Sequence, residues 1–517
     1  MKIKVIERGL DDVLPAQLGA SAPQHRNLDP ALHPFARPRE YTRALTAAKL
    51  ERMFAKPFVD SLEGHADGIY CSSRDPDRLG CVATGAGDGD IRLWSLPTRK
   101  TLVSIPKAHK NMVKDITFLP TSSSYSSENT ARASTSKVKL EPTLSNDVDD
   151  EDVALKRADT GGEETGHHAC FVSCSTDKTV KLWDAQTPQV DAPPSSNGKA
   201  VKRPLQTYLG RIGFNSVSHH RTESVFASAS DRIDVWDETR SEPLMTMSYG
   251  ALSASRQKDK DTSLGAGDHI ISVRFNQSET SVLASTSSDR TICLYDIRSG
   301  KSTSRLTLDI RANQLSWNPL QPPILLMASE DNNLYTFDIR NMTSATQVFK
   351  GHVGAVMACD WSPTGRDFVS GAYDRTVRLW KAGHGKSIDT YHTQRMQRVF
   401  TTLYTLDSRF VLSGSDDGNL RIWKSRASAK LGAMSTKELG KMEYRDSLRE
   451  KWKDVGEVSK IERQRFVPKT IHNATRLRRE MQSAARRKDE NRRKHAPKNR
   501  PIEKQKPERK RGIAKIE

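Results

Sequence analysis

The stretch Asp177-Lys-Thr-Val-Lys-Leu-Trp183-Asp184 is the clearest copy of a phrase that recurs along the chain. In this phrase an aromatic residue stands six positions after an Asp, usually behind a β-branched and an aliphatic residue. Alternation of apolar and polar residues is typical of a half-buried β-strand, and an Asp just before a strand is typical of a tight turn. The phrase therefore predicts a turn followed by a strand that buries its aromatic residue.

The phrase occurs seven times, and its spacing predicts the fold. The copies run Asp88–Trp94, Asp177–Trp183, Asp289–Tyr295, Asp331–Phe337, Asp374–Trp380 and Asp417–Trp423, with a copy one residue short at Asp231–Trp236. The last three aromatic residues are spaced by about the 40–45 residues of a WD40 β-propeller blade. The sequence therefore predicts an all-β, seven-bladed WD40 β-propeller with an N-terminal arm and helix and a basic, α-helical C-terminal extension.

The segments outside the repeats set the expected domain boundaries. Residues 1–56 should form an extended, proline-containing arm to about Arg39 and then a helix over Glu40–Ala55. Residues 57–424 should form the propeller, and residues 425–517 a basic helical domain. Insertions are expected at three places, an acidic disordered one at about 121–166 and polar loops at 186–203 and 253–267.

One strand-like segment lies before the first repeat. Pro57-Phe-Val-Asp-Ser-Leu62 reads as a strand, and the strands of the last repeat stop at Trp423. Because a propeller must close to remove its open edges, this segment is expected to supply the outer strand of the last blade.

The sequence offers no catalytic or metal-binding constellation apart from the repeat. His352, Asp374 and Trp380 are expected to form a structural chain with a hydroxyl group, not a catalytic pair. The six cysteines are scattered through strand-like segments, which favours buried thiols over a disulfide framework. We therefore expect no enzymatic activity, no cofactor and no metal, and no apolar stretch has the roughly 18–20 residues of a membrane span.

Positive charge is concentrated at the C-terminal end. Residues 424–517 carry 30 Lys and Arg against 13 Asp and Glu. This segment therefore holds nearly all of the net charge of +19 of the whole chain. A capping box at Ser435 and Glu438 predicts a helix to near Val455, and further helices are expected over 457–465 and 471–494. The final residues, 495–517, are expected to be extended or disordered.

The basic clusters of this tail are the main candidates for binding RNA or ribonucleoprotein. They can neutralise many phosphates, and the scarcity of aromatic residues argues against base stacking. An alternative role for them is a nuclear localisation signal. The candidate residues are Arg476, Arg478, Arg479, Arg486, Arg487, Lys488, Arg492, Arg493, Lys494, Arg509, Lys510 and Arg511.

Two repeats end in the pattern aromatic-Asp-x-Arg, at Tyr295–Arg298 and Phe337–Arg340. We call these two segments the docking boxes, because they look like the WD-x-Arg box by which some propellers bind the adaptor of cullin-RING ubiquitin ligases. The candidate docking residues are Asp296, Arg298, Asp338 and Arg340. In the alternative interpretation, each Asp and Arg merely completes its blade.

The chain resembles the WD repeat and SOF domain-containing proteins of the small-subunit processome. The resemblance covers nearly the whole chain and is carried by the seven repeats and by four quoted segments: Arg39-Glu-Tyr-Thr-Arg-Ala-Leu-Thr-Ala-Ala-Lys-Leu-Glu-Arg-Met-Phe-Ala-Lys-Pro-Phe58, Ala429-Lys-Leu-Gly, Lys441-Met-Glu-Tyr-Arg-Asp-Ser-Leu-Arg-Glu-Lys-Trp452 and Arg463-Gln-Arg-Phe-Val-Pro-Lys-Thr-Ile471. The acidic insertion departs from the compact pattern of the family.

The resemblance implies a nucleolar assembly factor for early ribosomal RNA processing, associated with the box C/D small nucleolar ribonucleoprotein. We therefore expect a nuclear, non-catalytic scaffold whose partners are pre-rRNA, small nucleolar ribonucleoprotein and other processome proteins. Animal members of the family are also described as substrate receptors of a cullin-RING ligase, which is the alternative function. No membrane partner is expected.

Overall fold

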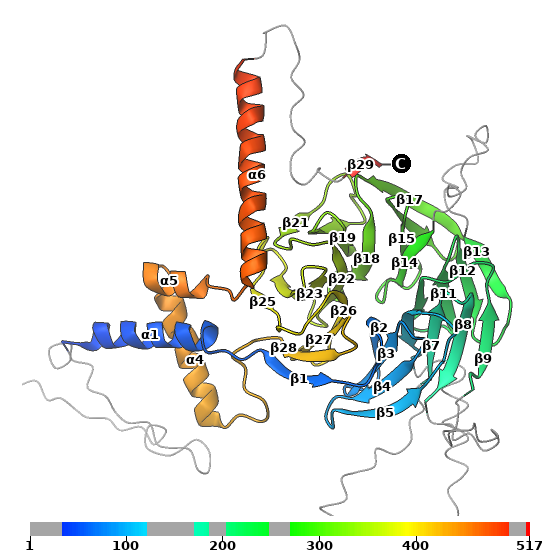
Figure 1. The fold of residues 1–517 in the computed structure, drawn as a ribbon, viewed down its shortest axis with the longest axis horizontal. Helices are drawn as coiled ribbons and strands as arrows, with labels where there is room; N and C mark the ends of the chain where they lie inside the picture. The colour runs from blue at the N-terminus through cyan, green and yellow to red at the C-terminus, as the bar shows by residue number, and fades with distance from the viewer. Residues whose placement is uncertain (1–33, 121–169, 186–202, 248–268, 496–512, 517) are drawn as a thin grey trace, which may run out of the picture. The chain divides into compact units, whose positions relative to one another are not determined.

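The computed structural model describes residues 34–120, 170–185, 203–247, 269–495 and 513–516 of the 517-residue chain. The chain forms two compact units. One unit combines Met1–Val59 with Lys424–Phe466, and the other combines Asp60–Trp423 with Val467–Glu517. The second unit contains seven antiparallel sheets arranged as the blades of a propeller (Figure 1).

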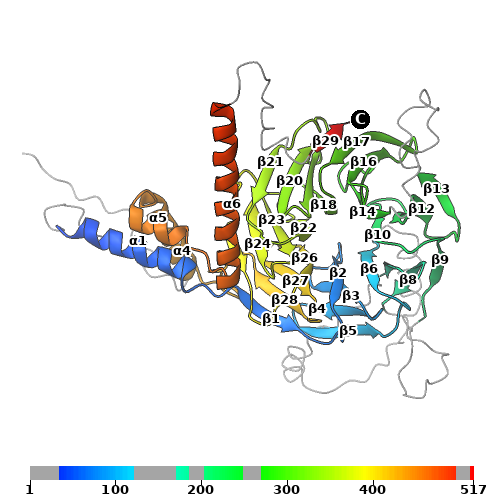
Figure 2. The same ribbon diagram turned by 45° about the horizontal axis from the view of Figure 1, so that its top comes forward.

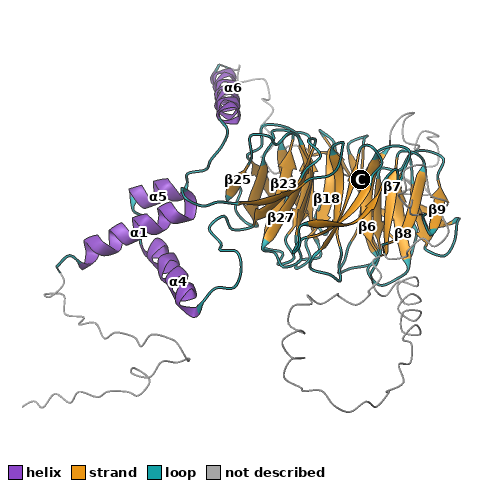
Figure 3. Cartoon of the chain, turned by 60° about the horizontal axis from the view of Figure 1, so that its bottom comes forward, coloured by secondary structure: helices purple, strands orange, loops and turns teal. Residues whose placement is uncertain are grey.

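Six of the seven described sheets have four strands and the sheet of blade 4 has five, and Figure 3 views the ring from its side. Blade 1 comprises β2 (Ile69–Arg74), β3 (Cys81–Ala86), β4 (Ile91–Ser95) and β5 (Lys100–Ile105). Blade 2 comprises β6 (Val113–Phe118), β7 (Cys170–Ser175), β8 (Thr179–Asp184) and β9 (Gln206–Leu209). Blade 3 comprises β10 (Ser216–His219), β11 (Val225–Ala229), β12 (Ile233–Asp237) and β13 (Pro243–Met247).

Blade 4 is the only one of the described sheets with a fifth strand. It comprises β14 (Ile270–Phe275), β15 (Val282–Ser287), β16 (Thr291–Asp296), β17 (Lys301–Leu308) and β29 (Ile513–Ile516). Blade 5 comprises β18 (Ala312–Trp317), β19 (Ile324–Ser329), β20 (Asn333–Asp338) and β21 (Gln347–Lys350). Blade 6 comprises β22 (Val356–Trp361), β23 (Asp367–Ala372), β24 (Val377–Lys381) and β25 (Asp389–Tyr391).

Blade 7 takes its outer strand from the beginning of the chain. Its sheet order is β1-β28-β27-β26, with β1 at Phe58–Leu62, β26 at Val399–Tyr404, β27 at Phe410–Ser415 and β28 at Leu420–Lys424. The backbone N–H of Lys424 donates to the carbonyl oxygen of Pro57 at 2.8 Å. The prediction that the ring closes with an N-terminal strand is confirmed.

The Asp of the repeated phrase closes the turn between the second and third strands of a blade. The carboxylate of Asp177, for example, accepts a hydrogen bond from the backbone N–H of Thr179 at 2.9 Å. In all six full copies the residue after the Asp adopts a positive φ, at Gly89, Lys178, Arg290, Asn332, Arg375 and Gly418. The copy at Asp231 is shorter because its turn is tighter, with the N–H of Ser230 bonded to the carbonyl of Arg232 at 3.0 Å.

The aromatic residue of every copy is buried in its blade. None of the seven is more than 2% exposed: Trp94, Trp183, Trp236, Tyr295, Phe337, Trp380 and Trp423. Burial of large side chains is the main favourable term in folding, so each blade is stabilised around the residue that marks its repeat. The seven-bladed fold predicted from these copies is confirmed.

A chain of hydrogen bonds fixes the Trp of blade 6. The indole N–H of Trp380 donates to Oγ of Ser370 at 2.7 Å, and Nε2 of His352 lies 2.7 Å from the same oxygen. Nδ1 of His352 lies 2.9 Å from the carboxylate of Asp374. Burial lowers the pKa of His352, so the neutral ring donates from Nδ1 to Asp374 and accepts at Nε2 from Ser370. The expected structural chain is confirmed, and it uses every polar group of the ring internally.

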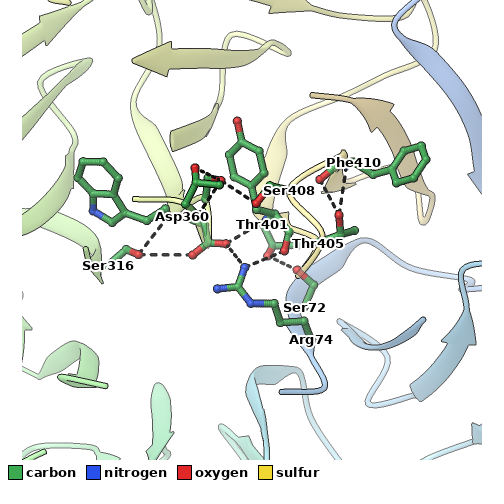
Figure 4. A network of polar contacts seen from close by, with 12 residues as sticks. Ser72, Arg74, Ser316, Asp360, Thr401, Thr405, Ser408 and Phe410 are labelled. Atoms are coloured by element: carbon green, nitrogen blue, oxygen red, sulfur yellow. Dashed lines mark hydrogen bonds and ion pairs between the residues drawn. The ribbon is translucent and has the colours of Figure 1, made fainter. Parts of the chain in front are cut away.

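Charged residues of the innermost strands join blades across the centre of the ring (Figure 4). Arg74 of blade 1 pairs with Asp360 of blade 6 at 2.9 Å and donates to the carbonyl of Tyr404 in blade 7 at 2.7 Å. Asp360 also accepts the backbone N–H of Tyr404 at 3.0 Å and the hydroxyl of Ser316 in blade 5 at 3.4 Å. One ion pair thus links four consecutive blades.

A second ion pair links the remaining blades. Arg274 of blade 4 pairs with Asp115 of blade 2 at 3.0 Å and donates to the carbonyl of Val217 in blade 3 at 2.9 Å. Asp115 also accepts the hydroxyl of Ser216 at 2.7 Å. Together the two pairs involve the innermost strand of every blade.

The described part of the other unit contains three helices, α1 (Ala36–Arg52), α4 (Thr436–Lys451) and α5 (Gly456–Glu462). The ring of Tyr41 lies 5.6 Å from that of Trp452, and Arg426 bridges Glu51 and Asp446 at 2.9 Å each. Burial alone would raise the pKa of Glu51, but its hydrogen bond and ion pair with Arg426 outweigh burial and lower that pKa. The unit is therefore held by a small apolar contact surrounded by ion pairs.

The helix predictions are confirmed with shifted boundaries. The first helix begins at Ala36 and not at Glu40, and the capping box of Ser435 and Glu438 is present at the start of α4. Helix α4 ends at Lys451, a turn earlier than expected. The N-terminal arm up to residue 33 and the predicted insertions around 121–166, 186–203 and 253–267 lie wholly or almost wholly outside the described residues.

The segment expected to be one C-terminal domain is divided between the two units. Residues up to Phe466 group with the N-terminal helix, whereas residues from Val467 onward group with the propeller. Pro468 stands at the start of helix α6 (Lys469–Lys494), next to this division. The sequence indicates where the helices are interrupted. It does not indicate which unit each part of the segment packs with, because this depends on tertiary contacts.

Replacing Ser370 by Ala should destabilise the propeller by roughly 1–3 kcal/mol, because the indole N–H of Trp380 and Nε2 of His352 lose their shared partner in a buried site. Thermal unfolding of the full chain measures this change. Ser104→Ala on the exposed edge of β5 (Lys100–Ile105) is the matched control and should change stability by no more than about 0.5 kcal/mol. Equal effects of both variants would contradict a stabilising role for this chain of hydrogen bonds.

Candidate nucleic-acid interface and docking boxes

Helix α6 carries most of the candidate RNA-binding residues. It runs from Lys469 to Lys494 and contains neither Gly nor Pro, so its composition of Arg, Lys, Ala, Glu, Gln and Met favours an uninterrupted helix. With 26 residues it is roughly 39 Å long. Three basic residues occupy its last turn, where they interact favourably with the negative end of the helix dipole.

Three arginines line one face of this helix. Arg479, Arg486 and Arg493 follow one another at intervals of seven residues, which is close to two helical turns. Arg487 and Lys494 lie on the neighbouring stripe by the same spacing. All five are exposed. We call these five residues the basic stripe.

Arg478 has a different role from its basic neighbours. Its guanidinium donates to the backbone carbonyl of His352 at 3.0 Å and to that of Asp331 at 3.4 Å. These carbonyls belong to loops of blades 6 and 5, so the side chain joins α6 to the propeller at the boundary between two blades. Ile471 stands seven residues before Arg478, on the same face of α6, and is only 8% exposed.

The anchoring face and the basic stripe point in different directions. Successive residues of an α-helix are rotated by about 100°, so Arg479 is turned by that angle from Arg478. One face of α6 can therefore hold the propeller while the other presents charge to solvent. The interval of seven residues between the apolar Ile471 and Arg478 is the sequence signal that would have distinguished the two faces.

The remaining candidates differ in their surroundings. Arg476 is exposed and pairs with Glu480 one turn later at 3.1 Å, while Lys488 and Arg492 are exposed on other faces of α6. Arg509, Lys510 and Arg511 lie outside the described residues. The structure thus assembles the candidates of residues 479–494 on one helix and assigns Arg478 to an intramolecular contact.

The two docking boxes have the same local geometry. The carboxylate of Asp296 accepts the backbone N–H of Arg298 at 3.1 Å, and that of Asp338 accepts the N–H of Arg340 at 3.0 Å. Each Asp therefore closes the turn that follows the third strand of its blade, and both Arg residues are exposed. Because blades 4 and 5 are neighbours, the boxes present two exposed guanidinium groups in equivalent positions.

The described residues do not assemble a metal centre or a reactive thiol. Among them, no group of three or more His, Cys, Asp or Glu side chains is placed to hold a metal ion. All six cysteines are buried, and burial raises the pKa of Cys170 to about 12, so its thiol stays protonated. No helix in the described part of the chain is both long and apolar enough to span a bilayer.

Comparison with known proteins identifies both the C-terminal extension and the repeats of the propeller. Residues 425–513 match the Sof1-like domain, and residues 56–95, 165–184, 262–296, 343–381 and 385–424 match the WD domain, G-beta repeat. The chain is 37% identical over 497 residues to Protein SOF1 of Saccharomyces cerevisiae, covering 95% of this chain and 91% of that protein. The chain belongs to the SOF1 family.

Vertebrate members of the SOF1 family are equally similar over the full length. The chain is 37% identical to DDB1- and CUL4-associated factor 13 of Danio rerio and 36% identical to that of Homo sapiens, each over 96% of both chains. The family resemblance read from the sequence is thus confirmed. The matched WD repeats leave out blades 3 and 5, which the weaker phrase copies at Asp231 and Asp331 had predicted.

Replacing Arg478 by Ala should loosen α6 from the propeller, because two charge-assisted hydrogen bonds, each worth about 1.5–3 kcal/mol, are lost. Hydrogen–deuterium exchange of residues 471–482 should become about tenfold faster or more, while exchange in the blades stays unchanged. Arg479→Ala, one residue along and exposed, is the control and should leave this exchange unaltered. Equal exchange in Arg478→Ala and the unaltered chain would show that the contact does not hold the helix.

Proposed function

We propose that the chain is a non-catalytic scaffold and assembly factor of nucleolar small-subunit ribosome biogenesis. In this role it acts in the maturation of small-subunit rRNA within the processome, as the resemblance to Protein SOF1 over nearly the full chain suggests. The observation that carries the proposal is the exposed basic stripe of α6, on a helix that is itself anchored to a rigid propeller.

The geometry suits contact with an RNA backbone. The stripe from Arg479 to Lys494 covers 15 intervals of the helix, roughly 22 Å, which is long enough to meet several successive phosphates. Arginine binds phosphate in a bidentate manner and releases counterions when it does so. The side chains of the stripe are not aromatic, so recognition of the backbone or of RNA shape is favoured over reading of single bases.

The partners of this role are pre-rRNA, the box C/D small nucleolar ribonucleoprotein and other processome proteins, and its place is the nucleolus within the nucleus. The propeller rims supply the protein-binding surfaces and the tail supplies the RNA-binding surface. A propeller suits this division because its closed ring keeps exposed loops in fixed positions. Arg509, Lys510 and Arg511 extend the same basic tail in sequence.

Changing Arg479, Arg486 and Arg493 together to Gln should weaken RNA binding because three phosphate contacts are removed. The plot of log K against log salt concentration should become shallower by about 2, since each contact with single-stranded RNA contributes about 0.7. Fluorescence anisotropy with a labelled fragment of the small-subunit precursor RNA measures this slope.

The matched control removes the same charge from another exposed helix face. Lys437, Lys441 and Arg445 are spaced by four residues on α4 and are all exposed. Their change to Gln should leave most of the salt dependence in place. The same slope for both triple variants would mean that binding follows net charge and not the basic stripe.

The second candidate function is that of a substrate receptor of a cullin-RING ubiquitin ligase. It is favoured by the two equivalent docking boxes on adjacent blades and by the name of the relatives called DDB1- and CUL4-associated factor 13. In this role the exposed guanidinium groups of Arg298 and Arg340 contact the adaptor, and the Asp of each box holds the turn that presents them. The two functions use different surfaces, so both can belong to one chain.

Reversing the charge of both box arginines, Arg298→Glu with Arg340→Glu, should abolish retention of the chain by immobilised DDB1. The melting temperature should stay within about 2 °C, because exposed substitutions change stability little. The control Arg366→Glu with Arg409→Glu alters two exposed loop arginines of blades 6 and 7 and should be retained normally. Retention of the box variant would limit the boxes to a role in their own turns.

A further inference from the structure

The end of the chain adds a strand to blade 4. Strand β29 pairs antiparallel with the outer strand β17, with Leu306 opposite Ile516, Thr307 opposite Lys515 and Leu308 opposite Ile513. Figure 2 shows β29 beside β17 at the rim of the ring. The described part of every other blade has four strands, so this fifth strand is not a requirement of the propeller.

The strand is anchored by a side chain as well as by its backbone. Ile513 is only 8% exposed and packs in a cluster with Leu306 and Leu308 of blade 4. The same cluster contains Ala312 and Met342 of blade 5. Ile513 therefore belongs to an apolar cluster that spans two neighbouring blades. Burying such a side chain contributes roughly 1.5–3 kcal/mol.

The acceptor strand β17 is longer than the outer strands of the other blades. β17 has eight residues, whereas the outer strands of blades 1, 2, 3, 5 and 6 have between three and six. β29 pairs only with the segment from Leu306 to Leu308, so the outer edge from Lys301 to Arg305 extends beyond it. An edge of this kind is a template for an added strand, because its backbone groups point outward.

We propose that the outer edge of β17, together with the apolar cluster shared by blades 4 and 5, is a strand-acceptor site for an extended segment with an aliphatic side chain. Its ligand is the chain's own C-terminal segment, Ile513–Ile516. The pairing attaches the end of the chain to the propeller at a second point, separate from the Arg478 contact. This site does not depend on RNA binding or on the docking boxes.

The pairing of β29 with β17 should be specific, but a separate peptide should be able to replace β29. Three residue pairs and one buried isoleucine give little affinity on their own, and the covalent connection compensates by keeping the local concentration of the segment high. Short terminal strands also open more readily than the interior strands of a sheet. The site should therefore accept a separate peptide once its own segment has been removed.

A peptide-binding experiment tests the acceptor site. The probe is a fluorescent peptide with the sequence of residues 512–517, Gly-Ile-Ala-Lys-Ile-Glu, measured by anisotropy against the chain that lacks residues 512–517. The peptide should bind this shortened chain at least tenfold more tightly than the full chain, whose site is filled. A peptide with Ile513→Lys should bind at least tenfold more weakly. Absence of binding to the shortened chain, or equal binding of both peptides, would overturn the proposal.

Disulfide trapping in the full chain provides a measurement that does not rely on truncation. Thr307→Cys with Lys515→Cys places two thiols at opposite positions, where Cα atoms of paired strands are about 4.5–5.5 Å apart and a disulfide can form. Thr303→Cys with Lys515→Cys is the control, because four residues along the strand add roughly 13 Å. The native cysteines are all buried and should not interfere.

The mass of the trapped product identifies the occupant. An intramolecular disulfide in the first variant, absent from the control, supports the chain's own C-terminal segment as the ligand. A disulfide-linked dimer would assign the site to the C-terminal segment of a second copy and overturn the proposal as stated. Equal trapping in both variants, or none in either, would also overturn it.

Discussion

The pairing of β1 with β28 is the constraint on which the rest of the structure depends. A propeller with an open sheet has two unsatisfied edges, and here the first strand of the ring completes the last blade. Because Pro57 and Lys424 are hydrogen-bonded, the chain enters and leaves the ring at adjacent positions. Helix α1 and helices α4 and α5 can therefore form one unit from opposite ends of the sequence.

Within the ring, the blades are joined by different forces at different radii. Near the centre, the innermost strands of four blades supply two Arg–Asp pairs, and those of the other three blades supply the carbonyls and hydroxyls that the pairs bind. Further out, each blade buries the aromatic residue of its repeat. Directional contacts thus set the relative position of the blades, while non-directional burial supplies most of the favourable free energy.

Local features could be predicted from the sequence, and contacts between distant segments could not. An Asp turn and a buried aromatic residue depend on neighbours within a few positions, so all seven copies were found, including the short one at Asp231. The basic character of α6 was equally visible. That Arg478 joins the propeller, or that Ile513 pairs with β17, depends on surfaces that no local pattern specifies.

The closure of the ring by β1 also has a consequence during synthesis of the protein. Leu62 leaves the ribosome long before Leu420, because 357 residues separate the end of β1 from the beginning of its partner β28. At the usual 5–20 residues per second, β1 waits for roughly 20–70 s. For that period the first blades can form in order from the N-terminus, but the ring stays open and its edges remain exposed to wrong pairing. The propeller is thus completed only late in the synthesis of each chain.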